Sequence, residues 1–488
     1  MPSLSSTPLD DLIVRLARYA HARPPLAAST LRTAALCLTD AISCALAALD
    51  EPTCVRRLGP WVPGTTVQDG VPVWGTLHRL DPVKAACDIS TMIRWLDFSD
   101  TTFTGGHPSD SIGALLAAAD HASRQRRRRG EPMLTMRDVL GAMVGAYEIQ
   151  GLLASENRFD HPSVGLDHVI GVKLASTAMA TALLGGSEGQ IAAALSNAVL
   201  DGHPLNAYRH VPNAGDRKSW AGGDAAGRGV WLALSAMRGE MGYPTPLSAP
   251  TWGFEAVYLG GRPLQLSRTL GSFVLDNVIF KLYPCQRNTT TAVESALRLH
   301  RWLGGRCEQV HRIVIHSHDE AIRRTDKTGE LPNRAARDHC MQYVVAVALL
   351  HGRLVPSDHE DDIARDPRID GLRARTHMVE NAAYTRGHHD LAVRSCANAV
   401  QIELEDGSLS PLEETLFPAG DPSVRDTAMP ALLSKFEALT LGRRPADQGR
   451  SLFERLCDIN TLPPVPEFMD WIVQWSGGGA AQDQETTV

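Results

Sequence analysis

Apolar residues recur at helical spacing through the first half of the chain. They occupy positions i, i+3, i+4 and i+7 of successive windows in which Ala and Leu are frequent and β-branched runs are rare. Glycine and proline interrupt the pattern between these windows. The pattern therefore predicts a series of helices, over residues 30–49, 110–124, 136–153, 173–184 and 191–199.

The pattern changes after about residue 271. Residues 310–317 and 399–405 alternate between polar and apolar side chains, which is typical of strands. The dipeptide Asp406-Gly407 predicts a hairpin turn that leads to a partner strand near residues 409–416. Helical spacing is present at 339–350 and again from 431 to 475. This half of the chain therefore predicts a smaller α+β unit followed by a helical segment that packs back on the first unit.

Composition narrows the choice of partners and compartment. The net charge of the 488 residues is −7, which disfavours a nucleic-acid or membrane surface but leaves room for local cations that bind a small anion. No apolar run reaches the ~20 residues of a membrane span, and the polar first ten residues contain neither a signal core nor an Arg-rich presequence. Nine cysteines without a CxxC pair are typical of reduced thiols. We therefore expect a cytoplasmic protein with neither nucleic acid nor membrane as partner.

Several long motifs are more specific than these patterns. Residues 95–110 read W-L-D-F-S-D-T-T-F-T-G-G-H-P-S-D, and residues 165–178 read G-L-D-H-V-I-G-V-K-L-A-S-T-A. Residues 208–220 read Y-R-H-V-P-N-A-G-D-R-K-S-W, and residues 325–343 read T-D-K-T-G-E-L-P-N-R-A-A-R-D-H-C-M-Q-Y. In order and spacing these motifs resemble the dehydratase branch of the MmgE/PrpD family, over about residues 10–475.

The resemblance implies a mainly α fold with two domains. A large all-helical domain is built from both chain ends, and a smaller α+β lid domain lies between them. The first part of the helical domain is expected at residues 1–272, the lid at 273–420 and the helical return at 421–488, with a disordered tail from Gly477 onward. Family members are usually homodimers with the active site between the two domains, and they move a proton next to a carboxylate without a metal or another cofactor.

Asp97, Thr101 and His107 are the first candidate site residues. They match the segment that lines the active site in the family, and Asp97 and Thr101 would share one face if the segment were helical. Two glycines before His107 permit a sharp bend into a cleft, and a histidine titrates near neutral pH, which suits proton transfer. In isolation the same pattern more often marks a helix cap and a turn histidine.

Lys218 matches the active-site lysine of the family and would pair with a substrate carboxylate or with developing negative charge. Arg209, His210 and Arg217 lie close to it in the sequence and are candidates for further carboxylate contacts. The alternative for this segment is a solvated basic turn.

His168 is the candidate for a second proton-transfer group because Asp167-His168 also matches the dehydratase pattern, just before a predicted helix. The alternative is a histidine that packs at the start of that helix. Lys281 and Asn288, at the junction of the two domains, are further candidates for substrate binding.

One departure from the family concerns the segment after Lys281. Relatives have a histidine here, whereas this chain has Y-P-C-Q-R-N-T-T-T, which places Asn288 or Thr290 at that position. Neither side chain exchanges a proton near neutral pH. Either the histidine is dispensable, or the pocket is remodelled for a substrate with an alkyl arm longer than methyl.

Other patterns favour no additional chemistry. His316 and His318 share a strand face but lack a third ligand at a defined spacing, so no metal site is expected. Residues 388–390 read as a polar loop and residues 126–129 as an exposed, basic helix end. Nucleotide-binding and serine-hydrolase motifs are absent from the sequence.

These observations favour a dehydratase that removes water from 2-methylcitrate or a longer 2-alkylcitrate and gives the 2-alkyl-cis-aconitate. A decarboxylase or isomerase of an aconitate-like acid is the alternative within the family. The alternative to an enzyme is a catalytically inactive homologue that only binds a metabolite. The missing histidine is the reason to consider it.

Overall fold

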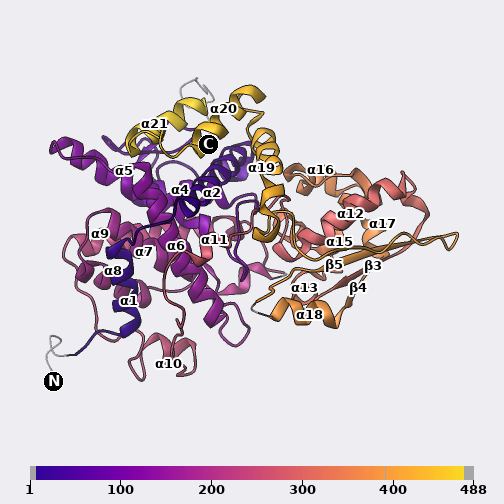
Figure 1. The fold of residues 1–488 in the computed structure, drawn as a ribbon, viewed down its shortest axis with the longest axis horizontal. Coiled ribbons are helices and arrows are strands. Elements are labelled where there is room, and N and C mark those ends of the chain that lie inside the picture. Colours follow the sequence, from indigo (N-terminus) through magenta and orange to yellow (C-terminus); the bar gives the residue numbers. More distant parts are fainter. Residues whose placement is uncertain (1–6, 211, 391, 478–488) are drawn as a thin grey trace.

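The first helical unit contains most of the predicted helices. The structure is a computed structural model that describes residues 7–210, 212–390 and 392–477. Indigo to magenta ribbons at the left of Figure 1 form this unit. Its elements are α1 (Asp11–Ala22), α2 (Ala28–Ala47), α3 (Pro52–Val55), α4 (Pro82–Arg94), α5 (Ile112–Arg128), α6 (Met136–Asn157), α7 (Val169–Leu183), α8 (Glu188–Leu200), α9 (Arg217–Met237), α10 (Phe254–Tyr258) and α11 (Phe273–Asp276), with a ribbon of β1 (Val71–Pro72) and β2 (Arg79–Leu80). All five predicted helices are confirmed.

Helix α2 is apolar nearly all round because it lies inside this unit. It contacts α4, α6 and α11, and most of its side chains are buried. By length and composition alone, residues 28–50 could cross a membrane, but 83% of the apolar window is buried inside the protein. Its hydrophobicity is therefore that of a core helix.

The second unit combines a mixed sheet with helices and has its own hydrophobic core. The sheet has the order β4-β3-β5-β6, in which β4 pairs with β3 in parallel and the other pairs are antiparallel. In Figure 1, α12, α15 and α17 run along one side of the sheet. The elements are α12 (Thr290–Leu303), β3 (Val310–Ser317), α13 (Asp319–Thr325), α14 (Arg334–Arg337), α15 (Met341–His351), α16 (Asp361–Ala364), α17 (Pro367–Ala374), β4 (Thr376–Glu380), α18 (Ala382–His389), β5 (Asn398–Leu404) and β6 (Glu413–Thr415).

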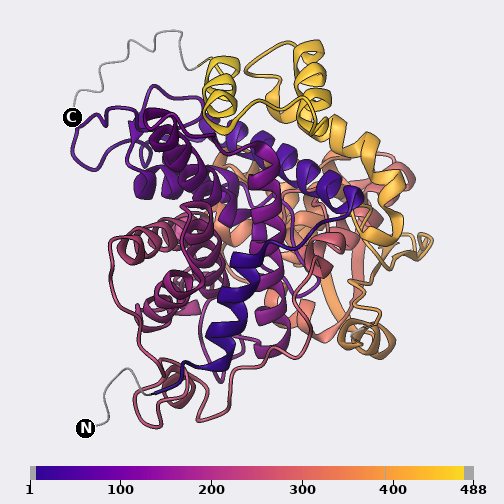
Figure 2. The same cartoon turned by 60° about the vertical axis from the view of Figure 1, so that its left-hand side comes forward.

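The end of the chain returns to the first unit, as Figure 2 shows in yellow. Helices α19 (Arg425–Thr440) and α20 (Ala446–Cys457) pack on α2, and α21 (Val465–Trp475) packs on α5. Leu432, Phe436 and Phe468 join the core of the helical unit. The fold is thus mainly α with a smaller α+β lid, as predicted. The boundaries at 272 and 420 stay predictions, and the tail predicted after Gly477 lies outside the described residues.

Glycines bring α4 and α9 unusually close together. A side chain at Gly223 would place its Cβ 2.4 Å from the carbonyl oxygen of Cys87 and 2.2 Å from Oγ1 of Thr91 on α4. Gly227, one turn further, faces the carbonyl oxygen of Val83 at 3.0 Å from its would-be Cβ. This close approach fixes the start of α9 beside the end of α4, where the candidate site lies.

We expect Gly223→Ala to lower the free energy of unfolding by about 1–3 kcal/mol, because the added methyl group meets backbone that cannot move aside. Denaturant unfolding measures this change. Gly189→Ala is the matched control, since Gly189 is an exposed residue of α8 with open space around it. The control should raise stability by about 0.5–1 kcal/mol. Equal behaviour of the two variants would contradict the tight contact.

Candidate active site

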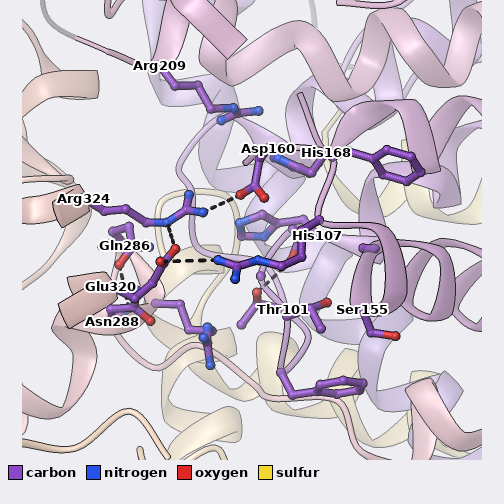
Figure 3. Close-up of a pocket in the computed structure, with 18 of the residues that line it drawn as sticks. Thr101, His107, Ser155, Asp160, His168, Arg209, Gln286, Asn288, Glu320 and Arg324 are labelled. Carbon is purple, nitrogen blue, oxygen red and sulfur yellow. Dashed lines mark hydrogen bonds and ion pairs between the residues drawn. The ribbon is translucent and has the colours of Figure 1, made fainter. Parts of the chain in front are cut away.

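A cleft of about 460 Å³ lies between the helical unit and the lid. Figure 3 shows that its walls come from both units, with His107 and His168 on one side and Gln286, Asn288 and Glu320 on the other. Six arginines and three carboxylates line it, which leaves three positive charges in excess. The charged side chains are those of Arg94, Arg158, Arg209, Arg287, Arg324, Arg394, Asp97, Asp160 and Glu320. This surplus suits a ligand with several negative charges.

Asp97 is a buried carboxylate surrounded by cations. Its Oδ1 lies 2.9 Å from both Nη1 of Arg94 and Nζ of Lys281, and 3.0 Å from Nε2 of His107. Its Oδ2 lies 3.1 Å from Nζ of Lys218. Burial alone would raise the pKa of Asp97, but the charges of Arg94, Lys281 and Lys218 hold this pKa well below its ordinary value. The carboxylate is therefore ionised and fixed from several directions.

The backbone around Asp97 is not helical, so the predicted helix face shared with Thr101 does not exist. Helix α4 ends at Arg94, and Asp97 adopts a left-handed conformation with φ of 51°. This conformation is uncommon for a residue other than glycine. Lys281 donates to both the carbonyl and the carboxylate of Asp97, which holds the turn in place. Thr101 lines the cleft and donates to the carbonyl of Gly106 at 2.7 Å.

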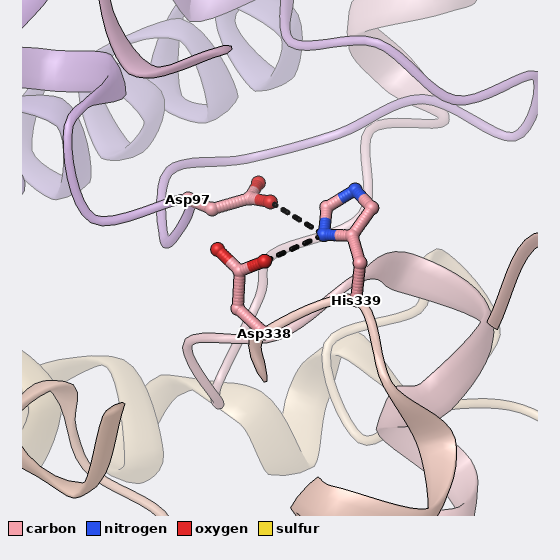
Figure 4. A group of neighbouring side chains, drawn as sticks. All are labelled: Asp97, Asp338 and His339. Carbon is pink, nitrogen blue, oxygen red and sulfur yellow. Dashed lines mark hydrogen bonds and ion pairs between the residues drawn. The ribbon is translucent and has the colours of Figure 1, made fainter. Parts of the chain in front are cut away.

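Lys218 connects the two units. The ammonium at the start of α9 lies 2.5 Å from Oδ2 of Asp338 in the lid and 3.1 Å from Oδ2 of Asp97. Asp97, Asp338 and His339 form a group whose ligand atoms lie within 4.8 Å of one another, drawn in Figure 4. Such a group could hold a metal ion, but the Lys218 ammonium already supplies a positive charge between the two carboxylates. Lys218 and Lys281 are thus behind the cleft wall rather than among the residues that line it.

His168 faces the cleft with one nitrogen free. Its Nδ1 lies 3.3 Å from Oδ1 of Asp167, while its buried Nε2 has no hydrogen-bond partner among the described residues. Arg209 donates to both oxygens of Asp167 and keeps that carboxylate ionised. Burial lowers the pKa of His168 to about 4, so the ring is neutral near pH 7. Asp167 thus orients the imidazole of His168, and its Nε2 is free to accept a proton.

His339 forms a second pair of this kind on the lid side. Its Nδ1 lies 2.7 Å from Oδ1 of Asp338, and the ring lines the cleft. Burial, with the nearby charge of Lys218, lowers the pKa of His339 to about 3. His339 was not among the predicted site residues, although its motif contributed to the family resemblance.

His107 has both ring nitrogens engaged. Nε2 pairs with Asp97, and Nδ1 lies 3.4 Å from Oγ of Ser99. Burial, and next the charge of Arg94, lower the pKa of His107 well below its ordinary value. His107 is thus a neutral member of the cleft wall that Asp97 positions.

The other predicted residues divide between the cleft and the surface. Asn288 and Arg209 line the cleft. His210 is exposed and lies outside the lining, while Arg217 pairs with Asp224 and stacks on Trp220, also outside. The structure therefore does not bring His210 and Arg217 to the cleft.

The sequence predicted Asn288 from the lid, but the other lid residues that line the cleft were missed. Residues 388–390 were expected to form a polar loop, which is wrong: His388 and His389 end helix α18 and line the cleft. Glu320 and Arg324 come from α13, while Arg287 lies beside Asn288. These side chains come from distant segments, so no spacing in the sequence could group them. The expectation for residues 126–129 is confirmed, because α5 ends there and Arg127, Arg128 and Arg129 are exposed, while Arg126 is half-buried.

Helix α19 supports the site from behind. Lys435 pairs with Asp40 at 2.6 Å and donates to the carbonyl oxygens of Phe98 and Lys281, at 2.7 and 2.9 Å. The returning chain end thereby fixes both backbone segments next to Asp97.

Known proteins match the chain along nearly its whole length. Residues 14–267 match the MmgE/PrpD N-terminal domain, and residues 283–458 match the MmgE/PrpD C-terminal domain. The chain belongs to the MmgE/PrpD family. It is 46% identical to a 2-methylcitrate dehydratase of Cupriavidus necator, over 96% of this chain and 98% of that protein.

Fungal members of the MmgE/PrpD family are similarly close. The mitochondrial 2-methylcitrate dehydratase of Yarrowia lipolytica is 43% identical over 95% of this chain and 90% of its own length. The 2-methylcitrate dehydratase-like protein oryR of Aspergillus oryzae is 42% identical, over 94% and 92%. Because one relative is named as mitochondrial, the relatives do not share a single compartment, and the cytoplasmic address stays a prediction.

We expect Asp97→Asn to lower the free energy of unfolding by about 3–5 kcal/mol, because it leaves three buried cations without their shared carboxylate. Denaturant unfolding measures the loss. Asp224→Asn is the control, since it removes a carboxylate from a solvent-exposed pair and should cost about 0–1 kcal/mol. A loss for Asp97→Asn no larger than that of the control would show that the buried cluster contributes little.

Acid should destabilise the protein through its neutral histidines. The pKa values of His107, His168 and His339 are lower in the folded state than the ordinary 6.5. Below about pH 6.5 the unfolded chain therefore binds protons that the folded protein does not, and stability falls with pH down to about pH 4. Each such group adds up to about 1.4 kcal/mol per pH unit to the slope.

Unfolding free energies measured at several values between about pH 7 and about pH 5 test this slope. His168→Gln should make it shallower, because one proton fewer is taken up on unfolding. His311→Gln, which removes an exposed histidine of β3, should leave it unchanged. An identical slope in all three proteins would rule out the contribution of His168.

Proposed function

We propose that the protein is a hydro-lyase that removes water from 2-methylcitrate or a longer 2-alkylcitrate and gives the corresponding 2-alkyl-cis-aconitate. The names of its relatives support this reaction class. The observation that carries the proposal is the cleft itself, where an excess of positive charge adjoins neutral, carboxylate-oriented histidines.

The charge of the cleft matches the substrate. A 2-alkylcitrate carries three carboxylates, which are ionised near neutral pH. The arginines of the lining exceed its carboxylates by three charges, so binding would neutralise the site. Charge-assisted hydrogen bonds from guanidinium groups are the strong contacts that orient such a ligand.

Two histidines would carry the proton transfers. Dehydration removes a proton from the carbon next to a carboxylate and expels the β-hydroxyl with a second proton. His168 and His339 face the same cleft, each beside a carboxylate, so that a neutral ring can accept the carbon-bound proton. The carboxylates of the bound substrate favour the protonated form of the other ring, which would then give this proton to the departing hydroxyl. His339 would thus supply proton chemistry from the lid, although the resemblance to the family places Asn288 or Thr290 at the position of a histidine.

Asp97, His107, Lys218 and Lys281 would support this chemistry electrostatically. Asp97 positions His107, and the lysines keep Asp97 ionised and the wall positively charged. Negative charge that develops on the substrate carboxylate during proton removal is stabilised by such fixed cations.

The alkyl arm has a suitable wall, formed by residues at and just after the end of α6 together with Phe103. Phe103, Ala154 and Phe159 line the cleft together with Ser155. This mixture of aromatic and small side chains offers apolar contact to a methyl group or a longer chain. Three points stay predictions: the length of the alkyl arm, the role in propionate metabolism or in secondary metabolite biosynthesis, and the homodimer.

The decisive experiment incubates the purified protein, with EDTA present, with 2-methylcitrate and separately with hexylcitrate. We expect absorbance from the new conjugated double bond and a mass loss of one water with at least one substrate. No turnover of either substrate would contradict the dehydratase and favour the inactive homologue. Release of carbon dioxide from an aconitate-like acid would contradict it and favour the decarboxylase.

His168→Gln and His339→Gln serve as catalytic controls in this assay. Each should reduce turnover by about 10²–10⁴-fold, because a positioned acid or base is lost. His311→Gln should retain full turnover, since His311 is exposed on β3.

A further inference from the structure

Arg287 is a buried cation of the lid that lacks a carboxylate partner. It is 8% exposed, lines the cleft, and donates from Nη1 to Sγ of Cys396 at 2.8 Å. No ion pair joins it to an acidic residue among those that the structure describes. A thiol sulfur is a weak acceptor and leaves the guanidinium charge uncompensated.

Two neutral side chains, those of Cys396 and His388, lie beside Arg287. Burial, and next the charge of Arg287, lower the pKa of His388 to about 4. His388 donates from Nδ1 to the carbonyl of Ser395 and stacks on His318, with ring centroids 3.8 Å apart. The carboxylate of Glu320 on α13 acts on the same ring, but among the described residues it forms no ion pair with Arg287.

Two further guanidinium groups converge on this place. Arg394 has a left-handed backbone with φ of 51°, lines the cleft, and has a buried Nε without a hydrogen-bond partner among the described residues. Burial lowers the pKa of Arg394, and the charges of Arg287 and Arg158 lower it further. Arg158, just after α6, forms an ion pair with Glu320 alone among the described residues, at 3.8 Å.

Glu320 is already committed elsewhere. Arg323 donates to its Oε2 at 2.6 Å, and Arg324 donates to its Oε1. Among the described residues, Arg158 has an ion pair with Glu320, and the charge of Asp390 acts on Arg394 without an ion pair, while Arg287 has neither. Three like charges thus meet in a partly buried place with incomplete compensation, which is costly unless a ligand supplies a further carboxylate. They share no carboxylate with the cluster around Asp97, whose cations are Arg94, Lys218 and Lys281.

We propose that Arg287 and Arg394, with Arg158 beside them, form an anchor for one carboxylate of the substrate, separate from the charge cluster at Asp97. The anchor rests on the proposed function, since it presumes a substrate with several carboxylates. A guanidinium fork binds a carboxylate through two parallel hydrogen bonds, which explains why arginines rather than lysines stand here. The anchor would hold one arm of the substrate against the lid while the histidines act on another part.

Calorimetric titration with propane-1,2,3-tricarboxylate tests the anchor, because this ligand lacks the hydroxyl group and cannot be dehydrated. The variants are Arg287→Gln, Arg394→Gln and the double substitution, all in the full chain. The control is Arg312→Gln, an exposed arginine of the lid strand β3. Thermal unfolding of each variant verifies that the fold is retained.

Each single variant should bind the tricarboxylate about 10–100-fold more weakly, as expected for a lost charge-assisted hydrogen bond. The double variant should lose far less than the product of the single losses, because both arginines hold the same carboxylate. The control should bind as the unaltered protein does.

Losses no larger than that of the control, or losses that multiply fully in the double variant, would overturn the anchor. If the unaltered protein binds the tricarboxylate but the variants give either of these results, the anchor is refuted and the proposed dehydratase is not. Failure of the unaltered protein to bind the tricarboxylate would overturn both. Anchor-dependent binding without turnover of any alkylcitrate would retain the anchor and refute the dehydratase.

Discussion

The buried carboxylate of Asp97 is the constraint on which the site depends. Desolvation of an unpaired carboxylate is expensive, so its position requires the cations that surround it. Arg94 comes from the end of α4, Lys218 from the start of α9 and Lys281 from the passage into the lid. One ionised group thereby brings together three segments that are far apart in the sequence, and Lys218 extends the link to Asp338 in the lid.

The charge of the cleft is divided into two regions with different tasks. Around Asp97, the cations Arg94, Lys218 and Lys281 are paired with the carboxylates of Asp97 and Asp338 and form a wall that is held by ion pairs. On the lid, Arg287 and Arg394 have no such balance and are available to an anion. Between these regions the imidazoles of His168 and His339 are neutral, because burial outweighs their carboxylate partners. A trianionic ligand would meet cations to bind it and bases that are not already protonated.

Periodicity was sufficient to predict most of the fold, since helices such as α2 and α6 bury continuous apolar faces that show in the sequence. The strands β3 and β5 alternate and were found, whereas β4 was missed because this edge strand is mostly exposed and has no apolar face.

Asp97, His107 and His168 could be predicted because they lie in long family motifs. Arg394, His388 and Arg158 could not, because only the tertiary fold brings their separate segments to one cleft. His210 and Arg217 show the opposite error. They are near Lys218 in the sequence and were therefore predicted to bind substrate, but the turn into α9 places them outside the cleft.

The glycine contact between α4 and α9 has a consequence for how the family can diversify. Two helices whose backbones touch behave as a single rigid body, so the spacing between Asp97 and Lys218 has little freedom to adjust to a different ligand. The lid side chains and the small residues at the end of α6 are under no such restriction. New substrates would therefore be accommodated by substitutions among the lid side chains and at the end of α6. The distance between Asp97 and Lys218 would stay the same.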